Sequence, residues 1–168
     1  DVGVLIAAVN DLPVFGTVTN LPDTDKNIAG GQVITFDQVA TAVPVLDVDI
    51  PVNVIQYRIE NVGSGKLRLG NSNAGVDIMT ASQSTFFVSN ASGLANGSNR
   101  STEFNWTPPL NATGEYVMMT LRAFDGIDYS ASTVQVKIRI NGVNAKPTLA
   151  KSSFTLGVEA GTAGTKQN

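Results

Sequence analysis

The sequence contains neither histidine nor cysteine, and these absences exclude much of enzyme chemistry. Without imidazole there is no Ser-His-Asp or Cys-His arrangement and no histidine-ligated metal. Without a thiol there is no thiolate nucleophile, iron–sulfur ligation or disulfide. Two carboxylate pairs remain, Asp47 with Asp49 and Asp125 with Asp128, but neither has an aromatic cleft nearby in the sequence, as glycoside hydrolysis would require. We therefore expect that the protein is not an enzyme.

Charge is also scarce. Charged residues make up 15% of the chain, against roughly 25% in an average domain. The net charge of −3 provides no basic field that would hold nucleic acid. The longest apolar run, residues 4–9, is far shorter than the roughly 20 residues that cross a bilayer. We therefore expect no nucleic-acid partner and no membrane insertion, and the 42% hydrophobic content indicates a chain that folds.

Alternation of apolar and polar residues dominates the rest of the sequence and predicts strands. Residues 131–140 place four aliphatic side chains on one face (Val134, Val136, Ile138 and Ile140) and Gln135, Lys137 and Arg139 on the other. Residues 53–60 repeat this pattern with Ile55, Tyr57 and Ile59, and residues 114–125 are apolar on both faces, as in a central strand. Shorter strands are predicted at 14–19, 32–37, 66–69, 76–80, 85–88 and 103–107.

Helical patterns are missing by comparison. No segment longer than ten residues carries the i, i+3, i+4, i+7 spacing of a helix free of Gly or Pro. Because parallel strands need crossover connections, which are usually helices, a parallel sheet is disfavoured. The sequence therefore predicts an all-β fold, an antiparallel β-sandwich.

An internal repeat places this fold in an array. Residues 9–15 (Val-Asn-Asp-Leu-Pro-Val-Phe) match residues 143–149 (Val-Asn-Ala-Lys-Pro-Thr-Leu) at an offset of 134, and each motif follows an alternating segment. We expect residues 1–10 to be the last strand of a preceding repeat and residues 11–147 to be one complete repeat. Residues 148–168 are then the first strand of a following repeat.

The motifs at the ends of this repeat resemble a known family. Val9-Asn10-Asp11-Leu12-Pro13, Asp47-Val48-Asp49 and Ala123-Phe124-Asp125-Gly126 are similar to the motifs of cadherin and cadherin-like repeats. The stretch from Phe104 to Tyr116 is closer to the tandem Ig-like repeats of large surface adhesins. The resemblance covers roughly residues 10–149, and residues 70–100 match nothing in it. It implies an Ig-like or cadherin-like sandwich module in a tandem array.

The resemblance also implies a Ca²⁺ site at the first module junction, held by acids at the matching positions Asp11, Asp47, Asp49 and Asp125. Carboxylate oxygens are the ligands that this hard cation requires. The sequence departs from the family because it has no Glu before position 60 and no Asp-Arg-Glu motif, and Ala145 replaces the junction acid in the second copy. The alternative is that these acids bond local backbone amides in turns and at strand ends.

Five Asn-x-Ser/Thr motifs cluster between residues 90 and 113 and predict glycosylation in a eukaryotic source. The five acceptors are Asn90, Asn96, Asn99, Asn105 and Asn111. Asn105 is the weakest candidate, because it lies on a predicted strand beside Trp106. The alternative is a polar loop without modification.

These features together predict a structural module of an extracellular adhesin or filament, a stiff spacer with a glycosylated or adhesive surface. Its partners would be neighbouring repeats, head-to-tail copies in a filament, or surface glycans and proteins. The alternative function is a carbohydrate-binding module that uses Trp106 and the loop at 90–105, although a Trp in this position also suits the core of a sandwich.

Overall fold

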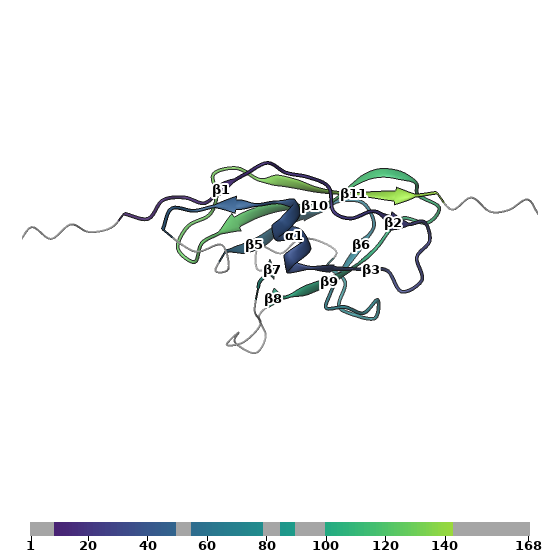
Figure 1. Cartoon of the computed structure of the whole chain (residues 1–168). Helices are drawn as coiled ribbons and strands as arrows, with labels where there is room; N and C mark the ends of the chain where they lie inside the picture. Colours follow the sequence, from purple (N-terminus) through teal and green to yellow (C-terminus); the bar gives the residue numbers. More distant parts are fainter. Residues whose placement is uncertain (1–8, 50–54, 79–84, 90–99, 143–168) are drawn as a thin grey trace, which may run out of the picture.

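The computed structural model describes residues 9–49, 55–78, 85–89 and 100–142 (Figure 1). The predicted terminal strands, apart from Val9 and Asn10, lie outside these ranges, as do Asn90, Asn96 and Asn99. The elements in chain order are β1 (Val14–Phe15), β2 (Thr24–Asp25), β3 (Gln32–Thr35), α1 (Phe36–Ala42), β4 (Val45–Leu46), β5 (Gln56–Val62), β6 (Lys66–Leu69), β7 (Phe86–Phe87), β8 (Arg100–Ser101), β9 (Glu103–Thr107), β10 (Gly114–Phe124) and β11 (Val134–Asn141).

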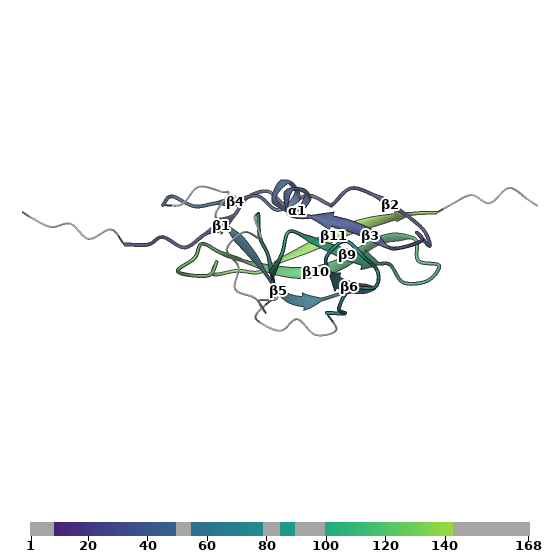
Figure 2. The same cartoon turned by 90° about the horizontal axis from the view of Figure 1, so that it is seen from below.

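The strands form three sheets, as Figures 1 and 2 show. The largest has the order β2-β11-β10-β5-β7-β8, the second has the order β3-β9-β6, and β1 pairs with β4 in a two-stranded ribbon. All long pairings are antiparallel, which confirms the all-β prediction. The expectation of a purely antiparallel arrangement was wrong at two edges, where β2 runs parallel to β11 and β8 runs parallel to β7. Each parallel pairing spans only two residues.

The alternation predicted for β11 and β5 is confirmed. In β11, Val136, Ile138 and Ile140 are buried, while Gln135 and Arg139 are exposed. Lys137 is half-buried rather than exposed because its Nζ lies 2.9 Å from Oε1 of Glu115 on the neighbouring strand β10. Val134, at the start of the strand, is also half-buried. In β5 and just before it, the predicted core residues Ile55, Tyr57 and Ile59 are all buried.

One hydrophobic core receives side chains from both larger sheets. The six-stranded sheet contributes Tyr57 and Leu121, and the three-stranded sheet contributes Phe104 and Trp106. The rings of Phe87 and Phe104, which come from different sheets, lie 3.9 Å apart between centroids. Side chains of the two sheets therefore meet in one core.

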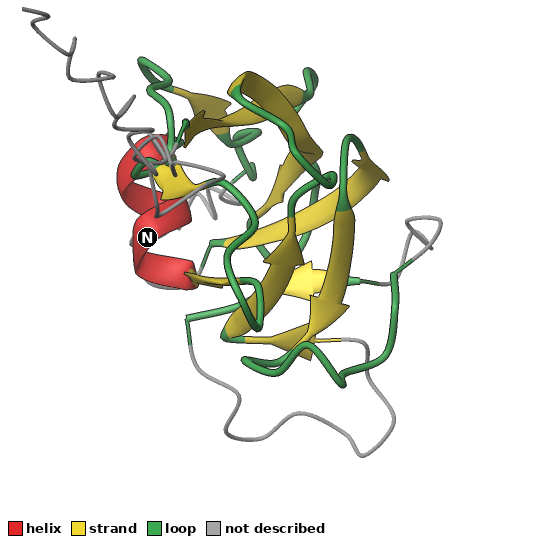
Figure 3. Ribbon diagram, turned by 90° about the vertical axis from the view of Figure 1, so that its right-hand side faces the viewer, coloured by secondary structure: helices red, strands yellow, loops and turns green. Residues whose placement is uncertain are grey.

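Helix α1 lies at one side of the strands (Figure 3). The strand predicted over residues 32–37 is present as β3 but ends at Thr35, which is the N-cap of the helix. The Thr35 side chain accepts a hydrogen bond from the Gln38 amide, and the Gln38 side chain accepts one from the Thr35 amide. This capping box fixes the first turn, and Pro44 follows shortly after the helix ends. The helix buries Phe36, Val39 and Ala42.

The described chain begins and ends at opposite ends of the molecule. The described chain enters on the side of the β1–β4 ribbon at one end of the long axis and leaves after β11 at the other (Figures 1 and 2). The single helix of the described ranges has seven residues, and no described helix can cross a membrane.

Candidate functional site

The predicted junction acids gather at the end of the molecule where the described chain begins. The chain at Asn10 and Asp11 runs between two acidic turns. On one side, the Asp11 amide donates to Oδ2 of Asp49 at 2.8 Å, and the Asp49 amide donates to Oδ1 of Asp47 at 2.8 Å. On the other side, Nδ2 of Asn10 donates to Oδ2 of Asp125 at 2.9 Å. Asp49 and Asp125 therefore hold the incoming chain from two sides, and Asp47 supports Asp49.

Asp125 is the buried member of this set, with 1% of its surface exposed. Its Oδ1 accepts the amides of Ile127 and Asp128, each at 2.7 Å, which closes the turn between β10 and β11. Burial by itself raises the pKa of Asp125, but the hydrogen bonds from Asn10, Asp128 and Ile127 together outweigh burial and hold the pKa below its usual range. The charged form of Asp125 is therefore part of the folded structure.

The acids of the predicted Ca²⁺ site make the contacts of turn residues, and the Ca²⁺ site itself stays a prediction. Oxygens of Asp47, Asp49 and Asp125 accept backbone amides, as expected of acids in turns. Within the residues that the structure describes, no three acidic side chains are arranged to hold a metal ion. A Ca²⁺ ion takes six to eight oxygen ligands. The geometry favours the alternative interpretation, in which these acids order the turns at the junction, and the role of Asn10 is one that the sequence did not reveal.

Trp106, the predicted sugar-stacking residue, is fully buried. Its indole Nε1 donates to the Ser64 carbonyl at 2.8 Å, which ties the core to the turn between β5 and β6. Gly65 in that turn has φ +88, and a Cβ there would lie 2.7 Å from Nε1 of Trp106. The indole is closed in and presents no face to a pyranose, which contradicts the alternative in which Trp106 is a stacking platform. The expectation that Trp106 lies in the core is confirmed.

The two glycosylation candidates in the described ranges differ sharply. Asn105 is buried, and its Nδ2 donates to the Gly30 carbonyl at 2.8 Å, so the fold leaves no room for a glycan there. Asn111 is exposed and has a positive φ of 61 in the loop before β10. Its Oδ1 accepts a hydrogen bond from Asn27, and its amide donates to Asn27. Asn111 therefore stays a prediction, and Asn105 is expected to remain unmodified.

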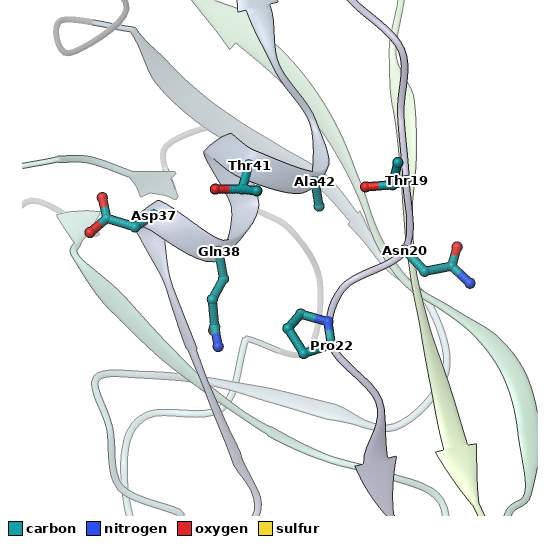
Figure 4. Close-up of a pocket in the computed structure, with 7 residues that line it drawn as sticks. All are labelled: Thr19, Asn20, Pro22, Asp37, Gln38, Thr41 and Ala42. Carbon is teal, nitrogen blue, oxygen red and sulfur yellow. The ribbon is translucent and has the colours of Figure 1, made fainter.

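A groove of about 410 Å³ lies between helix α1 and the chain that leads to β2 (Figure 4). The side chains of Gln38 and Pro22 lie on its two sides, and Thr19, Asn20, Asp37, Thr41 and Ala42 complete the lining. Nδ2 of Asn20 donates to Glu115 at 2.8 Å, and Lys137 bonds the other oxygen of that carboxylate. These two bonds hold the pKa of Glu115 below its usual range. Among the described residues that line the groove, none is an aromatic on which a sugar ring would stack.

Searches against protein-family models, curated proteins and solved structures found no match to this chain.

Proposed function

We propose that this chain is a structural module of an extracellular repeat protein, a surface adhesin or filament, in which it serves as a stiff spacer. The proposal is supported by the sequence repeat taken together with the buried side chains of β11. The offset of 134 that aligns the two Val-Asn-x-x-Pro motifs also aligns three buried residues of β11 with apolar residues near the start of the chain. Val136, Ile138 and Ile140 correspond to Val2, Val4 and Ile6. Residues 1–8 thus carry the inward-facing pattern of a last strand.

The position of the chain ends supports the same proposal. The described chain begins and ends at opposite ends of the long axis (Figure 1). Copies joined through these ends would extend in a line, because each junction adds the length of one module. At the first junction, bonds to Asp49 and Asp125 fix the incoming chain from two sides. A fixed connection of this kind resists bending, as a spacer requires.

The sheet order supports an Ig-like sandwich as the fold of each module. In the immunoglobulin fold, one sheet contains the strands A, B, E and D, and the other contains C, F and G. When β3, β5, β6, β9, β10 and β11 are taken as B to G in chain order, the neighbours become B-E-D and C-F-G. These are the neighbours β3-β9-β6 and β5-β10-β11 of this chain. This order is compatible with the resemblance to cadherin-like repeats.

Antibody labelling of intact cells tests the extracellular assignment. An antibody raised against residues 1–168 should label unpermeabilised cells of the source organism, and external protease should remove the signal. An antibody against a cytosolic protein is the matched control and should label only permeabilised cells. Labelling of this chain only after permeabilisation would overturn the proposal.

A glycan array separates the spacer from the carbohydrate-binding alternative. With Trp106 buried and no aromatic residue in the groove beside α1, we expect no glycan to be retained. Saturable binding that is lost in a Gln38→Ala variant, but retained in a Val76→Thr variant outside the groove, would instead assign a lectin function to the groove.

A further inference from the structure

The outer face of the β1–β4 ribbon is an apolar surface at the junction end, the end of the molecule at which the described chain begins. Val14 and Leu46 are directly opposite each other in the ribbon, and continuing this register places Leu12 opposite Val48. The exposed fractions are 46% for Leu12, 60% for Val14, 65% for Leu46 and 86% for Val48. The inner face of the same ribbon carries Pro13 and Val45, which are buried. The ribbon is therefore apolar on both faces, although only one face covers the core.

The second copy of the motif in the sequence lacks the outer apolar residues. At the offset of 134, Leu12 corresponds to Lys146 and Val14 to Thr148. The inward positions keep their character, because Pro13 corresponds to Pro147 and Phe15 to Leu149. The apolar residues at these two outer positions are thus present only in the first copy of the motif. A contiguous exposed apolar patch on a folded protein marks a site of contact.

We propose that the module to which residues 1–8 belong packs on this outer face, and this inference rests on the proposed function. The end of β11, Asn141, corresponds to Ala7, so only residues 8–13 separate that module from Val14. Six extended residues span about 20 Å at most. The preceding module is therefore tethered within about 20 Å of the ribbon, close enough to contact its apolar face.

The charge around the patch argues against a second copy placed ribbon to ribbon. Asp11 and Asp49 are exposed at the same end of the ribbon as Leu12 and Val48. In an isologous contact the same patch meets itself, so these carboxylates would be brought together with their copies. Like charges placed opposite each other at an interface disfavour that contact.

Amide hydrogen exchange tests the proposal in the natural polypeptide. The 168-residue chain is compared with a longer natural segment that begins one module upstream of Asp1. An uncovered two-residue ribbon opens readily, so its amides should exchange quickly in the shorter chain. In the longer segment we expect the amides of residues 12–16 and 45–48 to exchange about tenfold more slowly or slower. Equal rates at the ribbon in the two proteins would overturn the inference.

A matched pair of variants tests the role of the side chains. Leu12→Lys with Val14→Thr introduces the residues that the second motif has naturally, so the melting temperature of the 168-residue chain should be unchanged. In the longer segment the same double variant should abolish the added protection. Leu110→Lys with Val76→Thr changes residues that are 83% and 72% exposed outside the ribbon, and should leave the protection intact. Loss of protection in both double variants would contradict the assignment to this face.

The outcomes separate this inference from the proposed function. If the upstream polypeptide does not fold as a module of this kind, the array itself is wrong and both proposals fail. If it folds as such a module and the ribbon remains unprotected, only the packing on the β1–β4 face fails.

Discussion

Replacing Asp125 by Asn tests how the junction end is held together. Asn keeps one oxygen for the amides of Ile127 and Asp128, which now bond a neutral acceptor. Its new NH₂ group takes the place of the oxygen that accepts from Nδ2 of Asn10, so that bond is lost. Hydrogen bonds to charged groups contribute about 1.5–3 kcal/mol and neutral ones about 0.5–1.5 kcal/mol. Losing one charged bond costs about 1.5–3 kcal/mol and weakening two costs about 1–1.5 kcal/mol each, which gives about 3.5–6 kcal/mol in total.

Thermal unfolding followed by circular dichroism measures this cost. For a chain of this size, 1 kcal/mol corresponds to about 3 °C, so the variant should melt about 10–18 °C below the wild type at pH 7. Asp128→Asn is the matched control, because the Asp128 side chain makes only a longer, exposed bond to Asn10 at 3.3 Å. This control should melt within about 2 °C of the wild type.

The difference between the wild type and Asp125→Asn should also depend on pH. The pKa of Asp125 is lowered in the folded state, so its carboxylate stabilises the fold above the ordinary Asp pKa of about 3.9. That contribution is lost as the pH falls through the lowered, folded pKa. Because Asn does not titrate, the two proteins should become more alike on acidification from pH 5 to pH 2. A difference in melting temperature that is zero at pH 7, or constant over this range, would refute the reasoning.

Three further predictions follow from the fold and the sites. Ile138→Ala empties a fully buried position in β11 and should cost about 2–5 kcal/mol in urea unfolding, so an unchanged midpoint would contradict the register. Millimolar Ca²⁺ should give neither binding heat nor a higher melting temperature, since the acids already bond backbone amides, whereas saturable heat would restore the metal site. In a eukaryotic host, Asn111→Gln should remove one glycan from the intact mass and Asn105→Gln none, and an identical loss from both would refute the difference in accessibility.

The long strands could be predicted from the sequence because their own pattern determines them. In β11, alternation from Val134 to Ile140 assigns each side chain to a face without information from other strands. The shortest strands lack such a pattern. In β2, Thr24 and Asp25 become a strand only because β11 lies beside them. In β8, Arg100 and Ser101 depend in the same way on β7.

Helix α1 was missed because it is shorter than the ten residues used to recognise helical spacing. The signal that could have revealed it is the capping box, in which Thr35 is followed three residues later by Gln38. Phe36, Val39 and Ala42 then repeat every three residues, as in a helix that covers a core with one face. Residues 32–37 mix apolar and polar side chains as a strand does, so the change from strand to helix periodicity after Thr35 was not recognised.

The acids of the junction end could be found from the sequence, but their partners could not. The amides of Ile127 and Asp128 are local partners of Asp125, as expected of an Asp in a turn. Asn10 is separated from Asp125 by 115 positions, and only the folded chain brings the two together. The burial of Asn105 is likewise a property of the fold, because the turn at Gly30 closes over it.

Small-angle X-ray scattering of a segment of the natural polypeptide that begins about 134 residues upstream of Asp1, the offset of the repeat, tests the central claim most directly. The claim is that modules of this kind join end to end through a fixed junction. We predict a maximum dimension close to twice that of a single module, with a scattering curve that fits one extended arrangement. A compact particle with the modules side by side, or a curve that requires a broad range of bent arrangements, would contradict the stiff spacer.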